Sequence, residues 1–288
     1  MFTATLIARP GGLDAHHVTT LARDLGDGLV VWLSDAEAAE FRLDALPDDR
    51  WTLWEDLQRD GVDLIFQRAG GRKKAMLLAD MDSTMIRQEC IDELADMAGV
   101  GAHVAAITAR AMNGELDFEA ALIERVALLR GLPVSVIDRV LAERITLMPG
   151  GPELLATMRA NGAHAALVSG GFTAFTGAVA ARLGFDEHHA NTLLMAGGLL
   201  TGEVARPILG RQAKVDALAR ITHRLHLTPA DVIAVGDGAN DLGMLGAAGT
   251  GVALHAKPSV QAQCDIRVNH GDLTALLFIQ GYARAELA

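Results

Sequence analysis

The sequence predicts an α/β protein whose central parallel sheet is covered by helices on both faces. Beyond Pro149, short apolar runs alternate with segments of helical periodicity, and strands that alternate with helices form parallel sheets. The stretch from about Glu89 to Arg144 is rich in Ala, Leu, Glu and Arg and has almost no strand signal. Half of the 288 residues are hydrophobic and 21% are charged, which is enough apolar material for a packed core.

The first 72 residues predict a small α+β domain with the element order βαββαβ, the split-βαβ plan. Its expected strands are Thr5 to Ala8, Leu29 to Leu33, Glu40 to Leu43 and Val62 to Phe66, and its expected helices are Ala15 to Leu25 and Trp51 to Arg59. Glycines and basic residues follow from Gly70 to Lys74. We therefore expect one domain over residues 1–72 and a second over residues 73–288.

The second domain is expected to open with a buried strand, Ala75 to Ala79, that ends in Asp80. The helical block at about residues 89–146 then forms a cap inserted after this first strand. After the cap, helices and strands alternate. The expected helices are Pro152 to Ala160, Ala174 to Leu183, Gln212 to His226 and Leu242 to Ala248; the strands are His164 to Val168, Val232 to Val235 and Gly251 to Leu254, with a hairpin-like passage over Asn191 to Glu203.

Composition excludes several classes of partner. Lysine plus arginine number 25 against 36 for aspartate plus glutamate, and a net charge of −11 offers no footprint for nucleic acid or an anionic membrane. The two uncharged stretches, residues 162–181 and 242–256, contain glycines and polar residues, unlike a membrane helix. Two cysteines without a CxxC pattern, and a start without a secretory signal, predict a cytoplasmic protein.

Polar residues follow three of the expected strands, at the edge where an open α/β sheet binds ligands. The three segments are Asp80-Met81-Asp82-Ser83-Thr84, Ser169-Gly170-Gly171 and Gly236-Asp237-Gly238-Ala239-Asn240-Asp241. Either aspartate segment alone is more often a turn, but their joint occurrence after apolar strands favours a site. Two unit charges about 4 Å apart repel by about 4 kcal/mol at a dielectric near 20. Four converging carboxylates therefore need a cation, and oxygen ligands without His or Cys favour magnesium.

Arg125 stands out for a separate reason. It lies at helical spacing within the apolar stripe of the expected helix Phe118 to Arg130. A charge on a core-facing stripe must be paired or must face a ligand. An internal salt bridge, with Glu89 or with a residue near Glu124, remains the alternative to a ligand contact.

These motifs, together with Lys214, resemble the four ordered motifs of the haloacid dehalogenase superfamily, from about residue 75 to the C-terminus. Within it, Glu89, Phe118, Arg125 and the run Ser169 to Phe172 resemble the phosphoserine phosphatase family. The resemblance implies a Rossmann-like core with a helical-bundle cap and hydrolysis of O-phospho-L-serine to L-serine and phosphate, the last step of serine biosynthesis. It also implies that the N-terminal segment is an ACT-like module. Such a module could bind an amino acid, have a structural role, or join two copies of the chain into a homodimer.

The resemblance assigns a role to each matching residue. Asp80 is implied as the nucleophile and Asp82 as the general acid and base. Magnesium is implied to bind Asp80, the backbone carbonyl of Asp82 and Asp237, with Asp241 behind them. The implied substrate contacts are Ser169, Gly170, Lys214 and Asn240 near the phosphoryl group, Arg125 on the substrate carboxylate and Glu89 on its ammonium group.

Two other classes of function compete with this hypothesis. A related phosphatase for another small phosphomonoester would keep Asp80 and Asp82 but would need no zwitterion pair. A non-catalytic protein could use Asp80 as a receiver-like phosphoacceptor or sense amino acids through its N-terminal module. A receiver would not need Asp82 or the cap, and a sensor would bind serine without turnover. The sequence contains neither a Walker A motif nor a GxGxxG after a strand.

Overall fold

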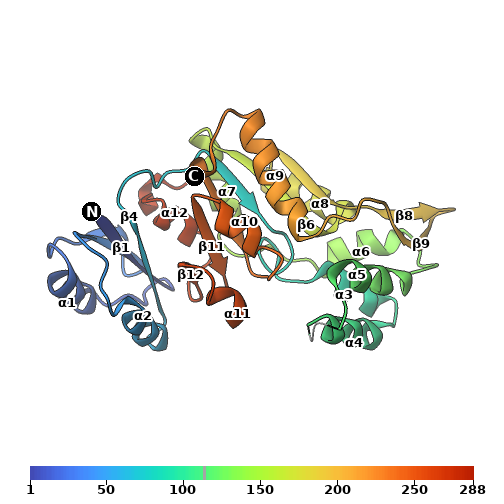
Figure 1. Ribbon diagram of the computed structural model, residues 1–288, viewed down its shortest axis with the longest axis horizontal. Coiled ribbons are helices and arrows are strands. Elements are labelled where there is room, and N and C mark those ends of the chain that lie inside the picture. Colours follow the sequence, from blue (N-terminus) through green and yellow to red (C-terminus); the bar gives the residue numbers. More distant parts are fainter. Residues whose placement is uncertain (113–114) are drawn as a thin grey trace.

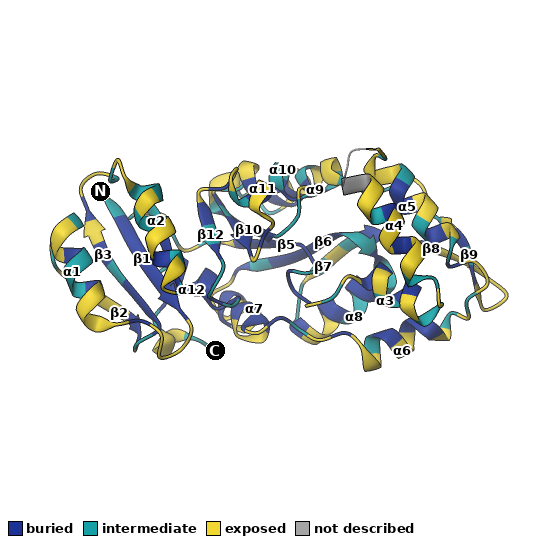
Figure 2. Ribbon diagram, turned by 90° about the horizontal axis from the view of Figure 1, so that it is seen from below, coloured by how far each residue is buried: buried dark blue, intermediate teal, exposed yellow. Residues whose placement is uncertain are grey.

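The chain folds into three parts that follow one another along the long axis of the molecule (Figure 1). The computed structural model describes residues 1–112 and 115–288. An N-terminal domain occupies one end, a sheet with helices on both faces occupies the middle, and a helical cap occupies the other end. The N- and C-termini both lie toward the N-terminal domain, away from the cap (Figure 2).

The N-terminal domain is a four-stranded antiparallel sheet with two helices. Its strands are ordered β2-β3-β1-β4. The elements are β1 (Phe2–Ala8), α1 (Ala15–Leu25), β2 (Val31–Ser34), β3 (Ala38–Leu43), α2 (Arg50–Arg59) and β4 (Val62–Arg68). This is the βαββαβ order expected from the sequence, and α1 has the expected bounds because Asp14 caps its first turn through a bond from the His17 N–H. Strands β1, β3 and β4 extend by two or three residues beyond the apolar runs that predicted them, whereas β2 begins two residues later and ends one residue later than expected.

The central sheet has six parallel strands in the order β12-β11-β10-β5-β6-β7. They are β5 (Met76–Ala79), β6 (His164–Phe172), β7 (Glu187–Asn191), β10 (Val232–Gly236), β11 (Thr250–Leu254) and β12 (Ile266–Val268). Alternate residues of the fully buried β5 pack against different helices. Met76 and Leu78 share a cluster with α9 (Arg211–Arg224) and α10 (Leu242–Ala247), while Leu77 and Ala79 share one with α7 (Gly151–Ala160) and α8 (Thr173–Leu183). The predicted sheet with helices on both faces is confirmed.

Two details of this sheet differ from the sequence-based expectation. Strand β6 continues through Ser169 and Gly170 to Phe172, so these residues belong to the strand and not to a turn after it. Strand β7 was not expected, because its sequence Glu-His-His-Ala-Asn has no apolar run. It lies at the sheet edge, where the first three of its residues are not buried, and such a strand needs no apolar run. Short elements α11 (Pro258–Gln261) and α12 (Ala275–Ile279) complete the core.

The cap consists of the four helices α3 (Cys90–Met97), α4 (Gly101–Met112), α5 (Phe118–Ala127) and α6 (Ser135–Glu143), as the helical block predicted. The chain enters and leaves it through two segments that pair with each other at Ile86 and Leu147. The expected hairpin is present as β8 (Leu193–Ala196) and β9 (Leu199–Val204). It borders the cap, since the Gly131 N–H donates to the Leu200 carbonyl at 2.8 Å.

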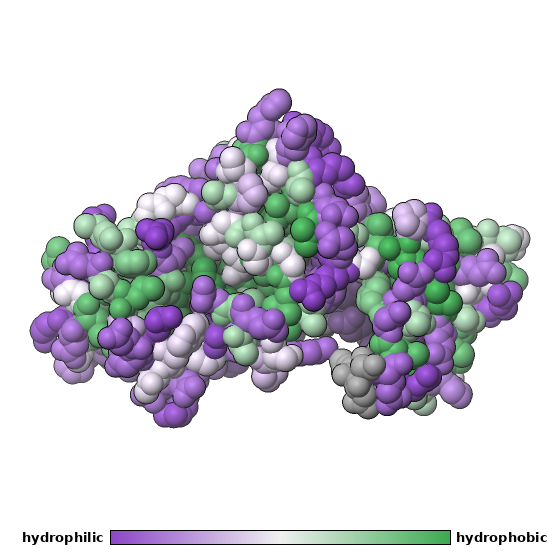
Figure 3. All heavy atoms as spheres, viewed as in Figure 1, coloured by the Kyte–Doolittle hydropathy of each residue, from purple (hydrophilic) through white to green (hydrophobic). Residues whose placement is uncertain are grey.

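Burial follows this layering. The strands of the two sheets are largely buried, whereas the outer faces of the helices are exposed (Figure 2). On the face drawn in Figure 3, hydrophilic residues cover much of the core and the cap, with smaller apolar areas between them. Within the described residues, every helix is too short or too polar to span a lipid bilayer.

Candidate active site

The parallel sheet brings the predicted motifs to one edge. Asp80 directly follows β5, and Asp237 directly follows the neighbouring strand β10. Ser169 lies in β6, the neighbour of β5 on its other side. The Asp80 N–H donates to the Val235 carbonyl at 3.0 Å, so the ladder continues to the base of the site. Because the carboxyl ends of parallel strands meet at one edge, residues about 90 and 155 positions apart in the chain converge here.

Lys214 joins two of the carboxylates. Its Nζ lies 2.6 Å from an oxygen of Asp80 and 2.6 Å from an oxygen of Asp241. The lysine is 1% exposed and comes from the first turn of α9. Burial alone would lower the pKa of Lys214, but the charges of Asp80 and Asp241 raise it above its ordinary value. The side chain is therefore a fixed ammonium group and not a solvated surface charge.

Three carboxylates form a group that fits a hard cation. Asp80, Asp237 and Asp241 each place an oxygen so that these atoms all lie within 4.8 Å of one another. Burial, followed by the charge of Asp241, raises the pKa of Asp80 well above its usual value, although Lys214 opposes this. Burial and the charges of Asp241 and Glu89 raise the pKa of Asp237 to about 6. Both shifts indicate that the negative charge here lacks sufficient compensation.

The oxygens of the three residues are not equally free. Asp241 is fully buried, and its two oxygens accept from the Lys214 ammonium and from the Gly238 N–H at 2.9 Å. Asp237 accepts from the Thr84 hydroxyl at 3.1 Å. Asp80 Oδ1 is buried and receives no directed hydrogen bond from the described residues, its contact with Lys214 being ionic. The oxygen donors of Asp80 and Asp237 therefore fit a hard divalent cation, and Asp241 orients Lys214 and the loop behind them.

Asp82 faces a different part of the site from Asp80. Its Oδ1 accepts from the Cys90 N–H at 3.0 Å, at the start of α3, and its Oδ2 lies 3.4 Å from the Ser169 hydroxyl. Burial and the nearby charge of Glu89 raise the pKa of Asp82 to about 7. A carboxyl group with that pKa can both give and take a proton near neutral pH, as a general acid and base must.

Ser169 and Gly170 are held in place by a residue that the sequence did not single out. Asn191, at the end of β7, is 2% exposed and donates from Nδ2 to the Gly170 carbonyl at 2.8 Å. The Asn191 side chain also donates to the Leu209 carbonyl at 3.1 Å and accepts from the Leu209 N–H at 2.7 Å. The Ser169 hydroxyl accepts from the Gly171 N–H at 2.9 Å. The only sequence signal for the role of Asn191 is a polar residue at the end of a strand. That signal could not be used, because strand β7 was itself not expected.

Glu89 and Arg125 approach this edge from the cap side. Ser83 Oγ donates to Glu89 Oε1 at 2.7 Å, which holds the carboxylate beside the first motif. Arg125 is half-buried on α5, and burial lowers its pKa, while the nearby charges of Asp92 and Glu89 raise it. It makes no ion pair within 4 Å to any residue that the structure describes. The alternative that Arg125 forms an internal salt bridge is therefore wrong for the described residues. Glu124 pairs with Arg110 at 3.0 Å instead.

The turn after β10 is shaped by close approaches of side chain to backbone. A Cβ on Gly236 would lie 2.4 Å from the Asp241 carboxyl carbon, and one on Gly238 would lie 2.3 Å from the Asn240 side-chain oxygen. Asn240 thus lies against the turn that carries Asp237. Phe118, at the start of α5, places its ring where it would meet a Cβ on Gly170 at 3.0 Å or on Gly210 at 3.2 Å. This phenyl ring is the cap's contact with the sheet edge at Gly170.

Comparison with known proteins decides the family. Residues 77–246 match the family model described as haloacid dehalogenase-like hydrolase, which is more than half of the chain. The chain belongs to the haloacid dehalogenase-like hydrolase family. The matched region contains the Asp80, Ser169, Lys214 and Asp237 segments described above. Membership agrees with the resemblance found in the sequence motifs.

Several members of the family are similar over most of the chain. A phosphoserine phosphatase from Vibrio cholerae is 44% identical over 207 residues, which are 72% of this chain and 63% of that protein. A crystal structure of a probable phosphoserine phosphatase from Vibrio cholerae superposes with a TM-score of 0.80 and 34% identity, covering 99% of this chain and 88% of that one. A haloacid dehalogenase family hydrolase from Salmonella enterica serovar Typhi gives a TM-score of 0.86 and 31% identity, covering 97% and 98%. This chain spans 53 to 64% of the length of the first curated relatives that it matches.

Proposed function

We propose that the protein hydrolyses O-phospho-L-serine to L-serine and phosphate through an aspartyl phosphate on Asp80. The observation that carries the proposal is the arrangement of opposite charges around one sheet edge. Asp80 and Lys214 lie in contact at the base, and Glu89 and Arg125 lie on the cap side. The first pair suits a phosphoryl group, and the second suits the two charges of an amino acid.

In the first step, an oxygen of Asp80 attacks phosphorus and the bond from phosphorus to the seryl oxygen breaks. Asp82 donates its proton to that oxygen, which leaves as the serine hydroxyl. Lys214, the Ser169 hydroxyl and the Gly170 N–H bind the phosphoryl oxygens and keep phosphorus in line. Phosphoryl transfer depends mainly on such positioning and on charge neutralisation.

In the second step, the Asp82 carboxylate takes a proton from a water molecule as the water oxygen attacks phosphorus. The bond from phosphorus to Asp80 breaks, and phosphate leaves with both groups restored. Magnesium, which Asp80, Asp237 and the backbone carbonyl of Asp82 would hold, supplies positive charge that offsets the charge of the phosphoryl oxygens. Asn240, on the Asp237 turn, contributes to binding the phosphoryl end of the substrate.

Selectivity for phosphoserine would come from the cap side. Arg125 binds the substrate carboxylate and Glu89 binds the ammonium group. A phosphate ester that lacks either charge would leave one of these side chains unpaired, and an unpaired polar group in a binding site strongly disfavours the wrong substrate. The half-buried position of Arg125, with no ion pair among the described residues, supports this role.

The reaction is tested with Asp80→Asn, which keeps the shape of the side chain and removes the nucleophile. We expect phosphate release from phosphoserine to fall by about 10³-fold or more, and mass spectrometry of quenched wild-type enzyme to show a phosphoryl group on Asp80. Asp216→Asn, an exposed change on the same helix as Lys214, should retain activity. Normal turnover in Asp80→Asn would contradict the mechanism.

The substrate is tested separately by comparing phosphoserine with sugar phosphates, nucleotides and phosphoethanolamine. Arg125→Ala should raise the KM for phosphoserine by about 10- to 100-fold, the effect expected for one lost charge-assisted hydrogen bond, and should change the KM for phosphoethanolamine little. Equal rates on all substrates would leave a phosphatase of broader range and would remove phosphoserine from the proposal. Serine binding without phosphate release would instead indicate an amino-acid sensor.

We further propose the setting of this activity. The N-terminal domain would comprise residues 1–72, the phosphatase domain residues 73–288 and the cap about residues 89–146. The reaction would be the last step of serine biosynthesis. It would take place in the cytoplasm, and two buried free cysteines support such a reducing location. A homodimer is supported by the edge strand β2, on which Val31 and Trp32 are 54% and 37% exposed. Val31→Lys should then give a monomer in light scattering.

A further inference from the structure

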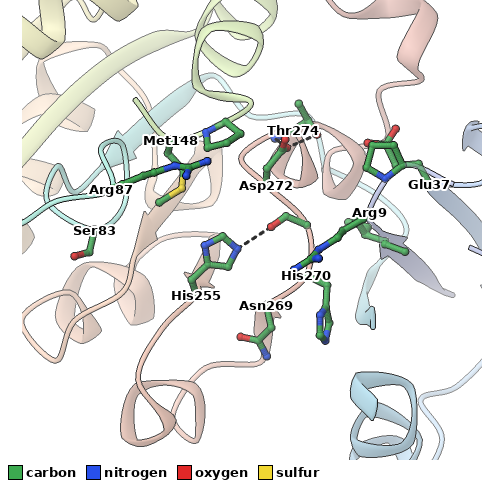
Figure 4. A pocket seen from close by; sticks show the side chains of 15 residues that line it. Arg9, Glu37, Ser83, Arg87, Met148, His255, Asn269, His270, Asp272 and Thr274 are labelled. Carbon is green, nitrogen blue, oxygen red and sulfur yellow. Dashed lines mark hydrogen bonds between the residues drawn. The ribbon is translucent and has the colours of Figure 1, made fainter. Parts of the chain in front are cut away.

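A second cavity lies at the same edge of the central sheet, between the core and the N-terminal domain. Its volume is about 670 Å³, which is within the usual range of about 300–1,000 Å³ for small-molecule sites. His255 follows β11 and Asn269 follows β12, so both come from carboxyl ends of sheet strands. Arg9 enters from the end of β1 in the N-terminal domain (Figure 4). None of the carboxylates of the candidate active site lines this cavity.

The walls of the cavity are held in place by buried polar contacts between the two domains. Asp63 of β4 is 0% exposed. Its two oxygens accept from the backbone N–H groups of Asn269, His270 and Gly271 at 2.8 to 2.9 Å. Gln58 of α2 accepts from the Asn269 amide at 2.7 Å. These contacts fix the lining loop before any ligand arrives, which lowers the entropy lost on binding.

The uncompensated charge in the cavity is positive. Arg9 and Arg87 make no ion pair with any described residue within 4 Å, and their side chains enter from opposite sides in Figure 4. Of the two acidic lining residues, only Glu37 is paired with a cation, and Asp272 keeps its charge, so the two arginines leave the lining net positive. Glu37 bonds Ser34 and Arg284, and Asp272 accepts from the Thr274 N–H and hydroxyl at 2.8 and 2.6 Å.

The cavity also contacts the segment that leads into the cap. Arg87 lies in that segment, and its N–H donates to the Thr146 carbonyl at 3.0 Å, next to the Ile86–Leu147 pair. Ser83 lines the cavity as well, and its hydroxyl donates to Glu89 at 2.7 Å. A ligand in the cavity would therefore touch the two segments that join cap to core, and Ser83, which holds Glu89.

We propose that this cavity binds a small organic or inorganic oxyanion, carboxylate or phosphate, between Arg9 and Arg87. Guanidinium groups match both oxyanions through paired N–H donors. The ring of His270 lines the same space and adds a polar contact, whereas the Asn269 side-chain amide is already bonded to Gln58 and Gln261. His255 already bonds the Gly271 carbonyl at 2.8 Å and serves as a fixed wall. The proposal does not depend on the proposed function, because it concerns binding and not turnover.

The test is calorimetric titration of the full-length protein, with magnesium and at constant ionic strength, using succinate and inorganic phosphate as separate probes. We expect Arg9→Ala and Arg87→Ala each to weaken the affinity by about 10- to 100-fold, and Arg9→Lys to weaken it less. Arg23→Ala on α1 and Arg182→Ala on α8 are exposed matched controls and should leave the affinity unchanged.

The two probes distinguish the sources of the anion. If succinate alone binds and the binding depends on the arginines, the ligand is a carboxylate. If phosphate alone does so, the ligand is a phosphate. If both do so, the site recognises the chemistry that the two oxyanions share. If phosphate binds equally to wild type, Arg9→Ala and Arg87→Ala, it occupies the catalytic edge and not this cavity. That result, together with no binding of succinate, overturns the proposal. Absence of binding by both probes also overturns it. Arg9 is exposed and its change cannot prevent folding, so Arg9→Ala decides the outcome if Arg87→Ala is unstable.

Discussion

The two ends of the molecule are attached to the same sheet edge in different ways. The N-terminal domain is fixed by a buried carboxylate, Asp63, that bonds three backbone N–H groups of the core. Arg267 of β12 adds to this interface by stacking on Trp51 and Trp54, at 4.0 and 4.9 Å from the ring centroids. Separating the two domains would break these charge-assisted hydrogen bonds and the ring contacts together, so it is costly.

The cap is attached through two paired backbone segments and through backbone hydrogen bonds to the hairpin β8–β9. The backbone pairs at Ile86 and Leu147, and the Met148 N–H donates to the Met85 carbonyl at 2.9 Å. Over the sheet edge, the phenyl ring of Phe118 lies against Gly170 and Gly210 without a hydrogen bond. An apolar contact between a ring and glycines can separate and re-form without leaving unpaired polar groups. At the sheet edge, the contact of the cap can therefore open for a ligand, whereas the N-terminal side is held by polar bonds to a buried carboxylate.

The largest effect should come from breaking the N-terminal interface. Asp63→Ala removes a fully buried carboxylate that accepts from three backbone N–H groups, and we expect a loss of about 3–5 kcal/mol in the free energy of unfolding. Urea denaturation measures it. Asp60→Ala, an exposed change nearby, is the control and should cost less than about 0.5 kcal/mol. A loss below about 1 kcal/mol in Asp63→Ala would contradict a rigid interface.

A second change disturbs the sheet edge without touching either interface. A Cβ on Gly171 would lie 2.6 Å from Asp82 Oδ2, so Gly171→Ala should displace the carboxyl group that we propose as the general acid. We expect kcat for phosphoserine to fall by about 10²-fold, within the usual contribution of general acid–base catalysis. Gly246→Ala, where a Cβ meets open space, serves as the control. Unchanged kcat in Gly171→Ala would remove Asp82 from that role.

The apolar contact of the cap should matter less, and mainly for binding. Phe118→Ala removes the ring over Gly170, and we expect the KM for phosphoserine to rise by about tenfold with kcat changed less than about threefold, as for loss of uniform binding. Unfolding should be affected little, because the ring is 36% exposed. Ile123→Ala is the matched control, since Ile123 is 40% exposed on the same helix. A fall in kcat at constant KM would contradict this role.

The smallest effect is expected at the half-buried ion cluster around Glu187, where the effect of burial on the pKa can be compared with the effect of charge. Burial would raise the pKa of Glu187, but hydrogen bonds from His189, His164 and Arg224 outweigh it and lower the pKa to about 2. A depressed carboxyl pKa contributes stability above the unfolded value of 4.5, and this stability is lost as the pH falls toward 2.

We therefore expect Glu187→Gln to lower the free energy of unfolding by about 1 kcal/mol at pH 7. The difference from wild type should shrink below pH 4.5 and vanish near pH 2. Thermal unfolding across this pH range measures it, with Glu143→Gln as the control, because the contact of Glu143 with Arg139 is exposed and 3.9 Å long. A difference that stays constant over the whole acidic range would show that charge is not its source.

Much of this protein is determined locally by its sequence. Apolar runs placed β5 and β10 within one residue of where they lie, because both are wholly buried. Helical periodicity predicted the cap as one helical block and placed the start of α5 at Phe118. The residues after β5 and β10 were placed at one edge by the general geometry of parallel sheets. Arg125 could be singled out because a charge interrupts an apolar stripe.

Other features were decided only by the tertiary structure. Strand β7 and its Asn191 have no local signal, since an edge strand needs no apolar run and a lone asparagine is common in turns. The raised pKa of Asp82 depends on burial and on Glu89, and the role of Asp63 depends on N–H groups about 206 positions away in the chain. Burial and long-range hydrogen bonds exist only once distant segments meet, so no local pattern of residues can encode them by itself.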